Sequence, residues 1–389
     1  MVRLLGLLQC LNILTPMAAS SLLAEVRALP LRNQRAIGAV VGACVADAAA
    51  RPMHWLYDAE KLESYLVSGQ KDPAFFPTSV SPFYSLPTGA NSCYFDLGFV
   101  MLQSLDGSSL TAPNLEDRFK ANLLQMFGDG TEYNQAYRRR TEKYDPKKRY
   151  DSREPIEGPW QQSSVSVFLE GGGGGNPQSK ETDGLVSTLP LIAQMASAEG
   201  SGLDQDAVRK LASILSSNAF ALSHTLSAAS ILASVIDTGE VSGSAFVKAV
   251  ERVDDKVLAL AAQGPGQEGV LFGKSVVLSE LRHVLAAAEA TPDGSDHVAR
   301  VLHWGKPCAN PGSFQGALHA VLTSKSFAQG TRQVVRAGGC NCSRANLAGS
   351  LLGACFLFDE DKGGIPASWL QQSDKAEATL RLALEKFRP

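Results

Sequence analysis

The chain is poor in cysteine for its length. It has seven cysteines in 389 residues, and only Cys340 and Cys342 lie close together in sequence. A disulfide across a single intervening residue would be strained, and small disulfide-held domains carry cysteine at a much higher density. The sequence therefore excludes a disulfide framework and predicts reduced thiols in a cytoplasmic protein.

An excess of either charge is also missing. The 36 Lys and Arg residues nearly balance the 39 Asp and Glu residues, which gives a formal net charge of -3. Domains that bind nucleic acid usually carry a clear basic excess, and helices that bind membrane surfaces carry a basic face. We therefore expect no nucleic-acid partner and no membrane span. Hydrophobic residues make up 44% of the chain, enough to bury a full core.

Two common catalytic motifs are absent. The chain has no Gly-x-Ser-x-Gly turn, with which α/β-hydrolases present a nucleophilic serine. The glycine run at residues 171–175 lacks the Gly-Lys-Ser/Thr that completes a phosphate-binding loop. The sequence thus gives no support for a serine hydrolase or a P-loop nucleotide-binding protein.

Residues 1–30 have the composition of an N-terminal extension. A basic start precedes a mostly apolar stretch at residues 4–19, and two serines follow it. This order is typical of a secretory signal, whereas the arginines just beyond it suggest a mitochondrial or other transit peptide, and a frayed helix is a third interpretation. The stretch is too short to span a bilayer comfortably. We place one folded domain at residues 31–389.

The remaining chain is dominated by apolar stretches of helical length. They recur from residue 185 to the C-terminus, and residues 36–50 form another, rich in small side chains. Residues 131–183 are polar and are expected to form loops. Because no run alternates Val, Ile and Thr with polar residues, the sequence predicts an all-α fold, built as a single multi-helix globule.

Three widely separated segments carry a joint signature. Residues 38–55 are rich in small residues and end in a Pro-x-His-Trp step, residues 92–105 lead into an apolar helix, and residues 338–345 read Gly-Gly-Cys-Asn-Cys-Ser-Arg-Ala. Together they resemble the ADP-ribosylglycohydrolase superfamily. The Pro-x-His-Trp and Asn-Cys-Ser-Arg strings are most similar to its branch of jellyfish J-type crystallins and selenoprotein J.

This resemblance implies two magnesium-class ions that act on an ADP-ribosyl group. Magnesium is a hard ion that takes oxygen ligands in octahedral geometry. The resemblance matches positions of this chain to the family's metal ligands segment by segment. In the first segment His54 stands in place of Glu, and in the second Ser92, Cys93 and Tyr94 stand in place of Thr, Asp and Asp. In the third, Cys340 and Cys342 stand in place of two Asp residues and Ser343 in place of Thr. No carboxylate remains at these positions. We therefore expect no cofactor, and in particular not the magnesium ions of the family. Asp47 and Asp96, which stand beside these positions, are the remaining candidates for catalytic carboxylates.

Three interpretations of these replacements stay open. The leading one is a protein that does not hydrolyse ADP-ribose bonds and serves as a structural, crystallin-like or ligand-binding protein, with an ADP-ribose-like small molecule as its expected ligand. The second is an ADP-ribosyl hydrolase with altered ligands. The third is a thiol redox or zinc protein that uses the Cys340 and Cys342 pair with His54 and Cys93, because thiolates and imidazoles suit zinc.

Overall fold

Helices form nearly all of the regular structure. The computed structural model describes residues 16–67, 72–107, 114–143, 154–171, 175–198, 202–264 and 266–388. The α-helices in these residues are α1 (Pro16–Arg27), α2 (Leu31–Ala50), α3 (Ala59–Val67), α4 (Cys93–Ser104), α5 (Leu115–Phe127), α6 (Glu132–Lys143), α7 (Ser163–Leu169), α8 (Asp183–Ser197), α9 (Gln205–Ala212), α10 (Ala219–Thr238), α11 (Gly243–Glu251), α12 (Asp255–Ala261), α13 (Lys274–Ala290), α14 (His297–Trp304), α15 (Gly312–Leu322), α16 (Phe327–Arg336), α17 (Asn341–Phe356), α18 (Ala367–Gln372) and α19 (Ala376–Lys386). The prediction of an all-α fold is confirmed.

The remaining regular elements are short. Two 3-10 turns, η1 (Arg51–Met53) and η3 (Glu360–Lys362), follow α2 and α17. The strands β1 (Tyr84–Ser85) and β2 (Ile156–Glu157) pair in parallel, with Tyr84 opposite Ile156. A pair this small adds little to the core and serves to tie two long connections together.

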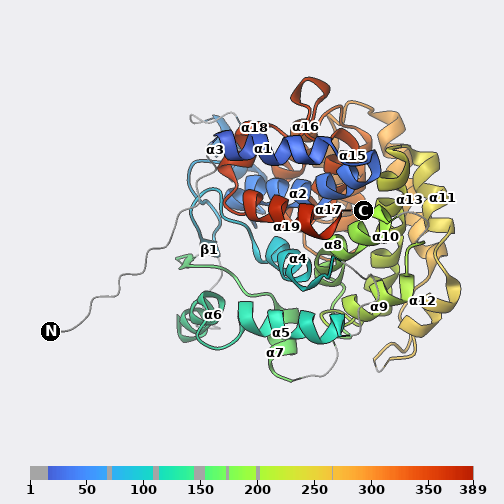
Figure 1. The fold of residues 1–389 in the computed structure, drawn as a ribbon. Coiled ribbons are helices and arrows are strands. Elements are labelled where there is room, and N and C mark those ends of the chain that lie inside the picture. Colours follow the sequence, from blue (N-terminus) through green and yellow to red (C-terminus); the bar gives the residue numbers. More distant parts are fainter. Residues whose placement is uncertain are drawn as a thin grey trace.

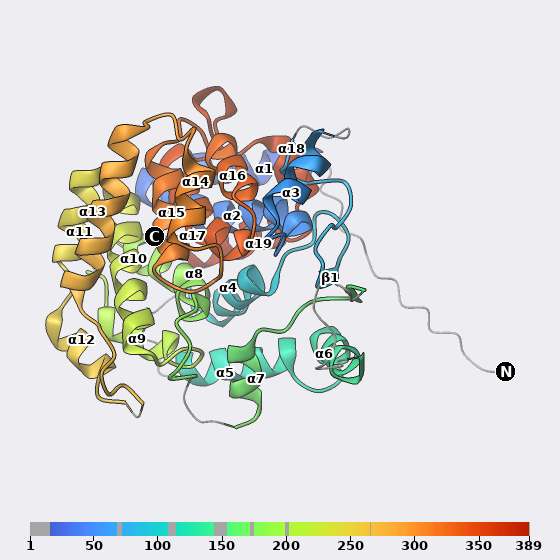
Figure 2. The same ribbon diagram turned by 180° about the vertical axis from the view of Figure 1, so that it is seen from behind.

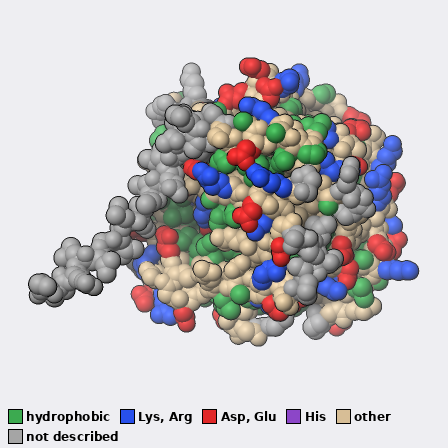
Figure 3. All heavy atoms as spheres, in the orientation of Figure 1, with side chains coloured by type: hydrophobic (Ala, Val, Ile, Leu, Met, Phe, Trp, Pro, Cys, Tyr) green, Lys and Arg blue, Asp and Glu red, His purple; other side chains and the backbone are tan. Residues whose placement is uncertain are grey.

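The helices are arranged around a central group. Figure 1 and Figure 2 show α2, α8 and α17 in the middle of the molecule, with α11, α12 and α13 along one flank and α5, α6 and α7 together below α4. The predicted single globule is confirmed by one continuous hydrophobic core that runs through elements from both ends of the chain. On the face drawn in Figure 3, acidic and basic side chains are interspersed.

Glycines bring α2 and α17 unusually close. A Cβ atom added to Gly42 would lie 2.2 Å from the carbonyl oxygen of Gly349, and one added to Gly353 would lie 2.1 Å from that of Gly38. Only glycine permits such an approach of two backbones. The two helices run antiparallel, so the C-terminal end of α2 meets the N-terminal end of α17. Those ends carry two of the three segments singled out in the sequence.

Helix α1 packs on the domain from within the predicted extension. Leu22, Leu23 and Val26 are buried, and Glu25 pairs with Arg388 near the other end of the chain. Residues 1–15 lie outside the described part of the chain. The division at residue 30 and the signal or transit segment stay predictions.

The expectation that residues 131–183 form loops is wrong in part. Helices α6 and α7 lie there, and β2 lies between them. α6 buries Tyr133 and Ala136 but is otherwise polar. Because α6 buries so few side chains, its sequence shows little helical periodicity of apolar residues, and for this reason the segment was expected to be a loop.

Two helical stretches are long and apolar enough to cross a membrane by length and composition. They are residues 31–53, whose apolar window is 100% buried in the protein, and α10, whose window is 83% buried. Core helices of globular proteins satisfy the same test, so this finding is weak evidence for a span.

Candidate functional site

The three segments of the sequence signature meet at the α2–α17 crossing. His54 follows η1, Ser92 is the N-cap of α4, and Cys340 is the N-cap of α17. The first and third segments are joined by two backbone hydrogen bonds of 2.8 Å, from Trp55 N to Gly339 O and from Gly339 N to Leu56 O. The fold therefore places the positions that the sequence analysis aligned with metal ligands in one region.

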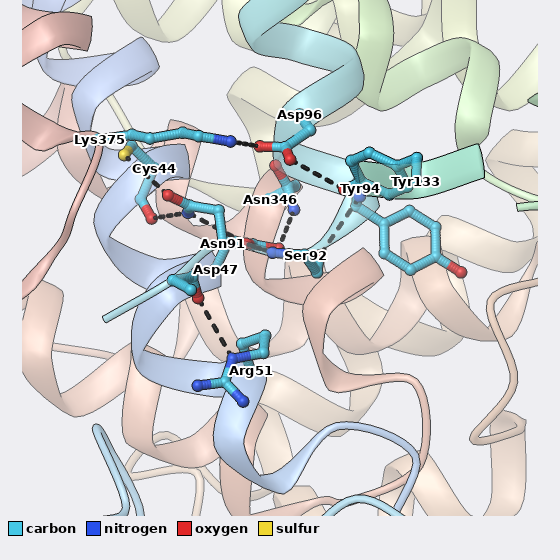
Figure 4. Close-up of polar contacts among 11 residues, drawn as sticks. Cys44, Asp47, Arg51, Asn91, Ser92, Tyr94, Asp96, Tyr133, Asn346 and Lys375 are labelled. Carbon is cyan, nitrogen blue, oxygen red and sulfur yellow. Dashed lines mark hydrogen bonds and ion pairs between the residues drawn. The ribbon is translucent and has the colours of Figure 1, made fainter. Parts of the chain in front are cut away.

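Asp47 on α2 is fully enclosed and surrounded by donors. Its Oδ2 accepts from the backbone N–H of Ser92 at 2.7 Å and from Asn91 Nδ2 at 3.1 Å. Its Oδ1 accepts from Ser92 Oγ at 2.6 Å and from Asn346 Nδ2 at 2.9 Å. Burial raises the pKa of Asp47 to about 6, against the hydrogen bonds from Ser92 and Asn91, which lower it. As Figure 4 shows, the carboxylate joins α2, α17 and the start of α4.

Asp96 on α4 belongs to a different set of contacts. Tyr133 Oη donates to its Oδ2 at 2.8 Å, and Lys375 Nζ pairs with its Oδ1. Figure 4 shows these three residues in a row across the upper part of the view, with Asp96 between Lys375 and Tyr133. They also line a cavity of about 540 Å³ that opens beside Asn91 and Asn122. Asp47 and Asp96, both proposed as catalytic carboxylates, thus each have their oxygens occupied by donors from the protein.

His54 and Cys340 form a direct contact. His54 Nε2 lies 3.4 Å from Cys340 Sγ, and His54 Nδ1 lies 2.8 Å from Tyr84 Oη. Cys340 Sγ also lies 3.2 Å from Tyr94 Oη. The His54 ring stacks on Trp55 with ring centroids 4.3 Å apart, which fixes its orientation.

The pKa of the Cys340 thiol lies well below its ordinary value. Burial by itself would raise this pKa, but a hydrogen bond with the Cys308 thiol, the neighbouring His54 imidazole and Ser343 together outweigh burial. The N-terminal end of a helix favours a thiolate as well. These neighbours favour the thiolate form of Cys340, whose side chain is fully buried.

The other two cysteines of the signature face elsewhere. Cys342 Sγ lies 3.9 Å from the backbone carbonyl oxygen of Asp47, and Cys93 faces the backbone of Gln162 and the side chain of Tyr133. Burial raises the pKa of both thiols well above their ordinary value. Of the four side chains that the sequence analysis grouped as a thiol or zinc site, the structure brings His54 and Cys340 into contact.

The hydroxyl positions of the signature serve local structure. Ser92 Oγ accepts from the backbone N–H of Tyr94 at 3.2 Å, which caps α4. Ser343 Oγ donates to the carbonyl oxygen of Cys340 at 2.8 Å and lies 3.1 Å from Ser313 Oγ. Burial raises the pKa of the Tyr94 phenol well above its ordinary value, so the phenol stays protonated near neutral pH.

The sequence did not predict that a third segment, the loop after α14, lies in this region. The loop after α14 runs beside Cys340, whose backbone N–H donates to Lys306 O at 2.9 Å. The same loop carries Cys308, and its hydrogen bond with Cys340 together with burial raises the pKa of Cys308 well above its ordinary value. Burial raises the pKa of Glu181, just before α8, and the neighbouring Cys308 lowers it. Cys308 stands in no motif, so no sequence signal could have paired it with Cys340.

Within the described residues, no group of three or more His, Cys, Asp and Glu side chains is arranged to hold a metal ion. The contacts around His54 and Cys340 instead include two phenols, Tyr84 and Tyr94. The Cys340 thiol donates to Tyr94 Oη, and a phenol that stays protonated is a poor metal ligand.

Comparison with known proteins agrees with this fold. The sequence model of the ADP-ribosylglycohydrolase family matches residues 28–388. The chain is 26% identical to crystallin J1A of Tripedalia cystophora over 359 residues, 90% of this chain and 95% of that protein. It is 25% identical to crystallin J1B of the same organism over 367 residues, 92% of this chain and 97% of that protein.

A solved structure shares the fold. It is described as an ADP-ribosylglycohydrolase-related protein complex, and it superposes with a TM-score of 0.52 and 19% sequence identity. The match covers 92% of this chain and 98% of that chain. The resemblance to the ADP-ribosylglycohydrolases and to their J-type crystallin branch, which the sequence analysis stated, is confirmed.

Proposed function

This chain belongs to the ADP-ribosylglycohydrolase family, and we propose that it is a member that does not hydrolyse ADP-ribose bonds and has a structural, crystallin-like role. The observation that carries the proposal is that both acidic side chains near the signature are occupied. Asp47 accepts four hydrogen bonds, and Asp96 is held by Tyr133 and Lys375.

The side chains at the ligand positions do not suit a magnesium pair. Magnesium requires near-octahedral oxygen coordination, whereas His54 and Cys340 offer nitrogen and sulfur that already contact each other. Ser92 and Ser343 use their hydroxyls to bond Asp47 and the Cys340 carbonyl. A magnesium ion would have to break these buried hydrogen bonds before it gained any oxygen ligand.

The relatives support the crystallin-like role. Two proteins named crystallin match more than nine-tenths of their own length at 25–26% identity. A crystallin-like role needs a stable, soluble fold and no turnover. The continuous core around the α2–α17 crossing is consistent with such a role. We also propose that the chain is related to selenoprotein J and that it is located in the cytoplasm.

Ligand binding without hydrolysis is the second part of the proposal. The described chain has a cavity beside Asp96 whose lining combines apolar side chains with amides, carboxylates and Lys375. An ADP-ribose-like small molecule carries hydroxyls and phosphates that such groups can bind. Ligand binding can be tested separately from hydrolysis, because binding is measurable in a protein that has no turnover.

The decisive experiment measures hydrolysis and metal content together. The purified full chain is incubated with ADP-ribosylated serine and arginine peptides in magnesium, and free ADP-ribose is quantified against an active family member as positive control. We expect no release above the buffer rate and no stoichiometric magnesium or zinc by elemental analysis. Magnesium-dependent release that stops on chelation would overturn the proposal.

A variant sharpens the same assay. Replacing Asp47 by Asn in a metal-dependent hydrolase would lower turnover, whereas in a protein without turnover it changes stability alone. Calorimetric titration with ADP-ribose then separates the two non-hydrolytic roles. Saturable binding supports the ligand-binding part, and its absence leaves the structural role.

A further inference from the structure

We infer that His297 and His319 form an acid-sensitive contact that holds α14 against α15, and that protonation of this pair releases α14 and the loop after it. Neither histidine belongs to the site described above. The inference is independent of whether the chain hydrolyses ADP-ribose bonds, because it concerns the attachment of one helix.

The two imidazoles meet through their ring nitrogens in the interior of the protein. His297 Nδ1 lies 3.0 Å from His319 Nδ1, and the rings stack with centroids 5.2 Å apart. Both side chains are buried, with 2% and 0% of their surface exposed. At this distance one Nδ1 must carry a proton and the other must not. The contact therefore exists only while at least one of the two rings is neutral.

Asp296 determines which ring donates. His319 Nε2 lies 3.7 Å from Asp296 Oδ1, so the proton of the neutral His319 ring stands on Nε2, toward the carboxylate. His319 Nδ1 is then the acceptor, and the Nδ1–H of His297 is the donor. His297 Nε2 remains without a proton, and it is buried without a hydrogen-bond partner among the described residues. A proton added there makes a buried N–H with no acceptor, which is unfavourable.

The charges around the pair also oppose its protonation. Burial comes first, and it is joined by Arg344 of α17, which acts on His297, and by Arg300 of α14, which acts on His319. Asp296 acts on His319 in the opposite sense, but it also forms an ion pair of 2.6 Å with Arg300. The pKa of each imidazole consequently lies below its ordinary value, and that of His297 lies well below it.

Other ionisable side chains on the neighbouring helices are engaged elsewhere or exposed. Helix α15 has no ionisable residue besides His319. On α16, Arg332 pairs with Asp72, and on α13, Glu280 pairs with His224. The exposed ones include His303 of α14, Arg336 of α16 and Arg282 of α13.

Helix α14 is held by few buried side chains. Its buried residues are His297 and Val301, and the half-buried Trp304 lies edge-on to His319 with ring centroids 5.5 Å apart. Two of these three side chains thus contact His319. The loop after α14 carries Lys306, whose carbonyl oxygen accepts from the backbone N–H of Cys340 at 2.9 Å. Release of α14 therefore loosens a loop that contacts the start of α17.

Acid favours the released form by proton linkage. A histidine in an open segment takes up its proton near pH 6.5, whereas the buried pair stays neutral to lower pH. Above about pH 6.5 neither form binds an extra proton, so opening does not depend on pH. Below it the open form binds more protons. The equilibrium constant for opening then rises by about tenfold per pH unit for one imidazole and up to about a hundredfold for two.

The test is hydrogen–deuterium exchange of the full chain, measured by mass spectrometry from about pH 7.5 to about pH 5 and corrected for the intrinsic exchange rate at each pH. Protection of the backbone amides of residues 297–311 should stay constant above about pH 6.5 and fall by at least about tenfold per pH unit below it. Helix α19, which carries no histidine, is the reference within the same molecule and should keep its protection.

Two variants assign the effect to the pair. His297→Gln combined with His319→Gln replaces both imidazoles by amides, which hydrogen-bond but do not titrate, so the fall of protection in α14 should disappear. His303→Gln changes an exposed histidine of the same helix and should behave as wild type. Wild-type protection of α14 that stays constant down to about pH 5, or that falls equally in α19, would overturn the inference. The same fall in the double variant would overturn it as well, and the wild-type result decides by itself where the double variant does not fold.

Discussion

Asp47 and Cys340 lie at the same helix crossing but in opposite kinds of surroundings. Asp47, at the end of α2, accepts four hydrogen bonds and joins three elements. Cys340, at the start of α17, contacts the His54 imidazole and the Tyr94 phenol, and its surroundings hold the pKa of its thiol well below the ordinary value although burial raises it. The oxygens of Asp47 are thus occupied by four donors that hold the fold, whereas the Cys340 sulfur lies beside an imidazole and a phenol.

The difference shows that burial alone does not decide what a polar group does. Both residues are fully buried, and burial opposes ionisation of each. For Asp47 burial wins and the pKa rises to about 6, whereas for Cys340 the neighbours win and the pKa falls. The Asp47 cluster is thus structural, and the Cys340 cluster has the chemistry of a site.

The largest effect is expected from Asp47→Ala. Ser92 would lose the acceptor for both its backbone N–H and its hydroxyl, and each buried unsatisfied donor costs about 1–3 kcal/mol. The free energy of unfolding should therefore fall by about 2–6 kcal/mol, measured by urea denaturation.

Asp255→Ala is the matched control for that variant. Asp255 pairs with Lys274 on the surface, with 71% of its side chain exposed. Exposed ion pairs contribute about 0–1 kcal/mol, so this change should be small. Equal losses for the two variants would show that Asp47 has no special structural role.

A smaller loss is expected from Gly42→Ala, which attacks the crossing that both clusters share. The new Cβ would lie 2.2 Å from Gly349 O, so the helices must separate. Overpacking of this kind costs about 1–3 kcal/mol. Gly202→Ala, where nothing lies within 4 Å of the added Cβ, is the control.

The sequence predicted the two helices of the crossing from their local composition. It predicted that the three segments meet from the resemblance to the family. It could not predict which thiols face each other. Residues two apart on a helix point to different sides, so Cys340 faces His54 while Cys342 faces the carbonyl of Asp47. The loop that carries Cys308 reaches Cys340 through the backbone hydrogen bond from Cys340 N to Lys306 O, which leaves no trace in side-chain patterns.

The smallest effect is a pH dependence carried by Cys340. Its pKa is depressed in the folded protein, so between that pKa and the unfolded value of about 8.5 the unfolded chain binds one proton more. Stability from this group is therefore present at high pH and is lost as pH falls through the folded pKa. Its slope is about 1.4 kcal/mol per pH unit.

Urea denaturation of wild type and Cys340→Ser at a series of pH values below about 8.5 measures this slope. The difference between the two proteins should grow with pH, because only wild type retains the Cys340 thiolate. Cys342→Ser is the matched control, since burial raises the pKa of Cys342 and it carries no thiolate in this range. A difference that stays constant with pH would place the Cys340 thiol in the same neutral, structural class as Cys342 and remove the contrast with Asp47.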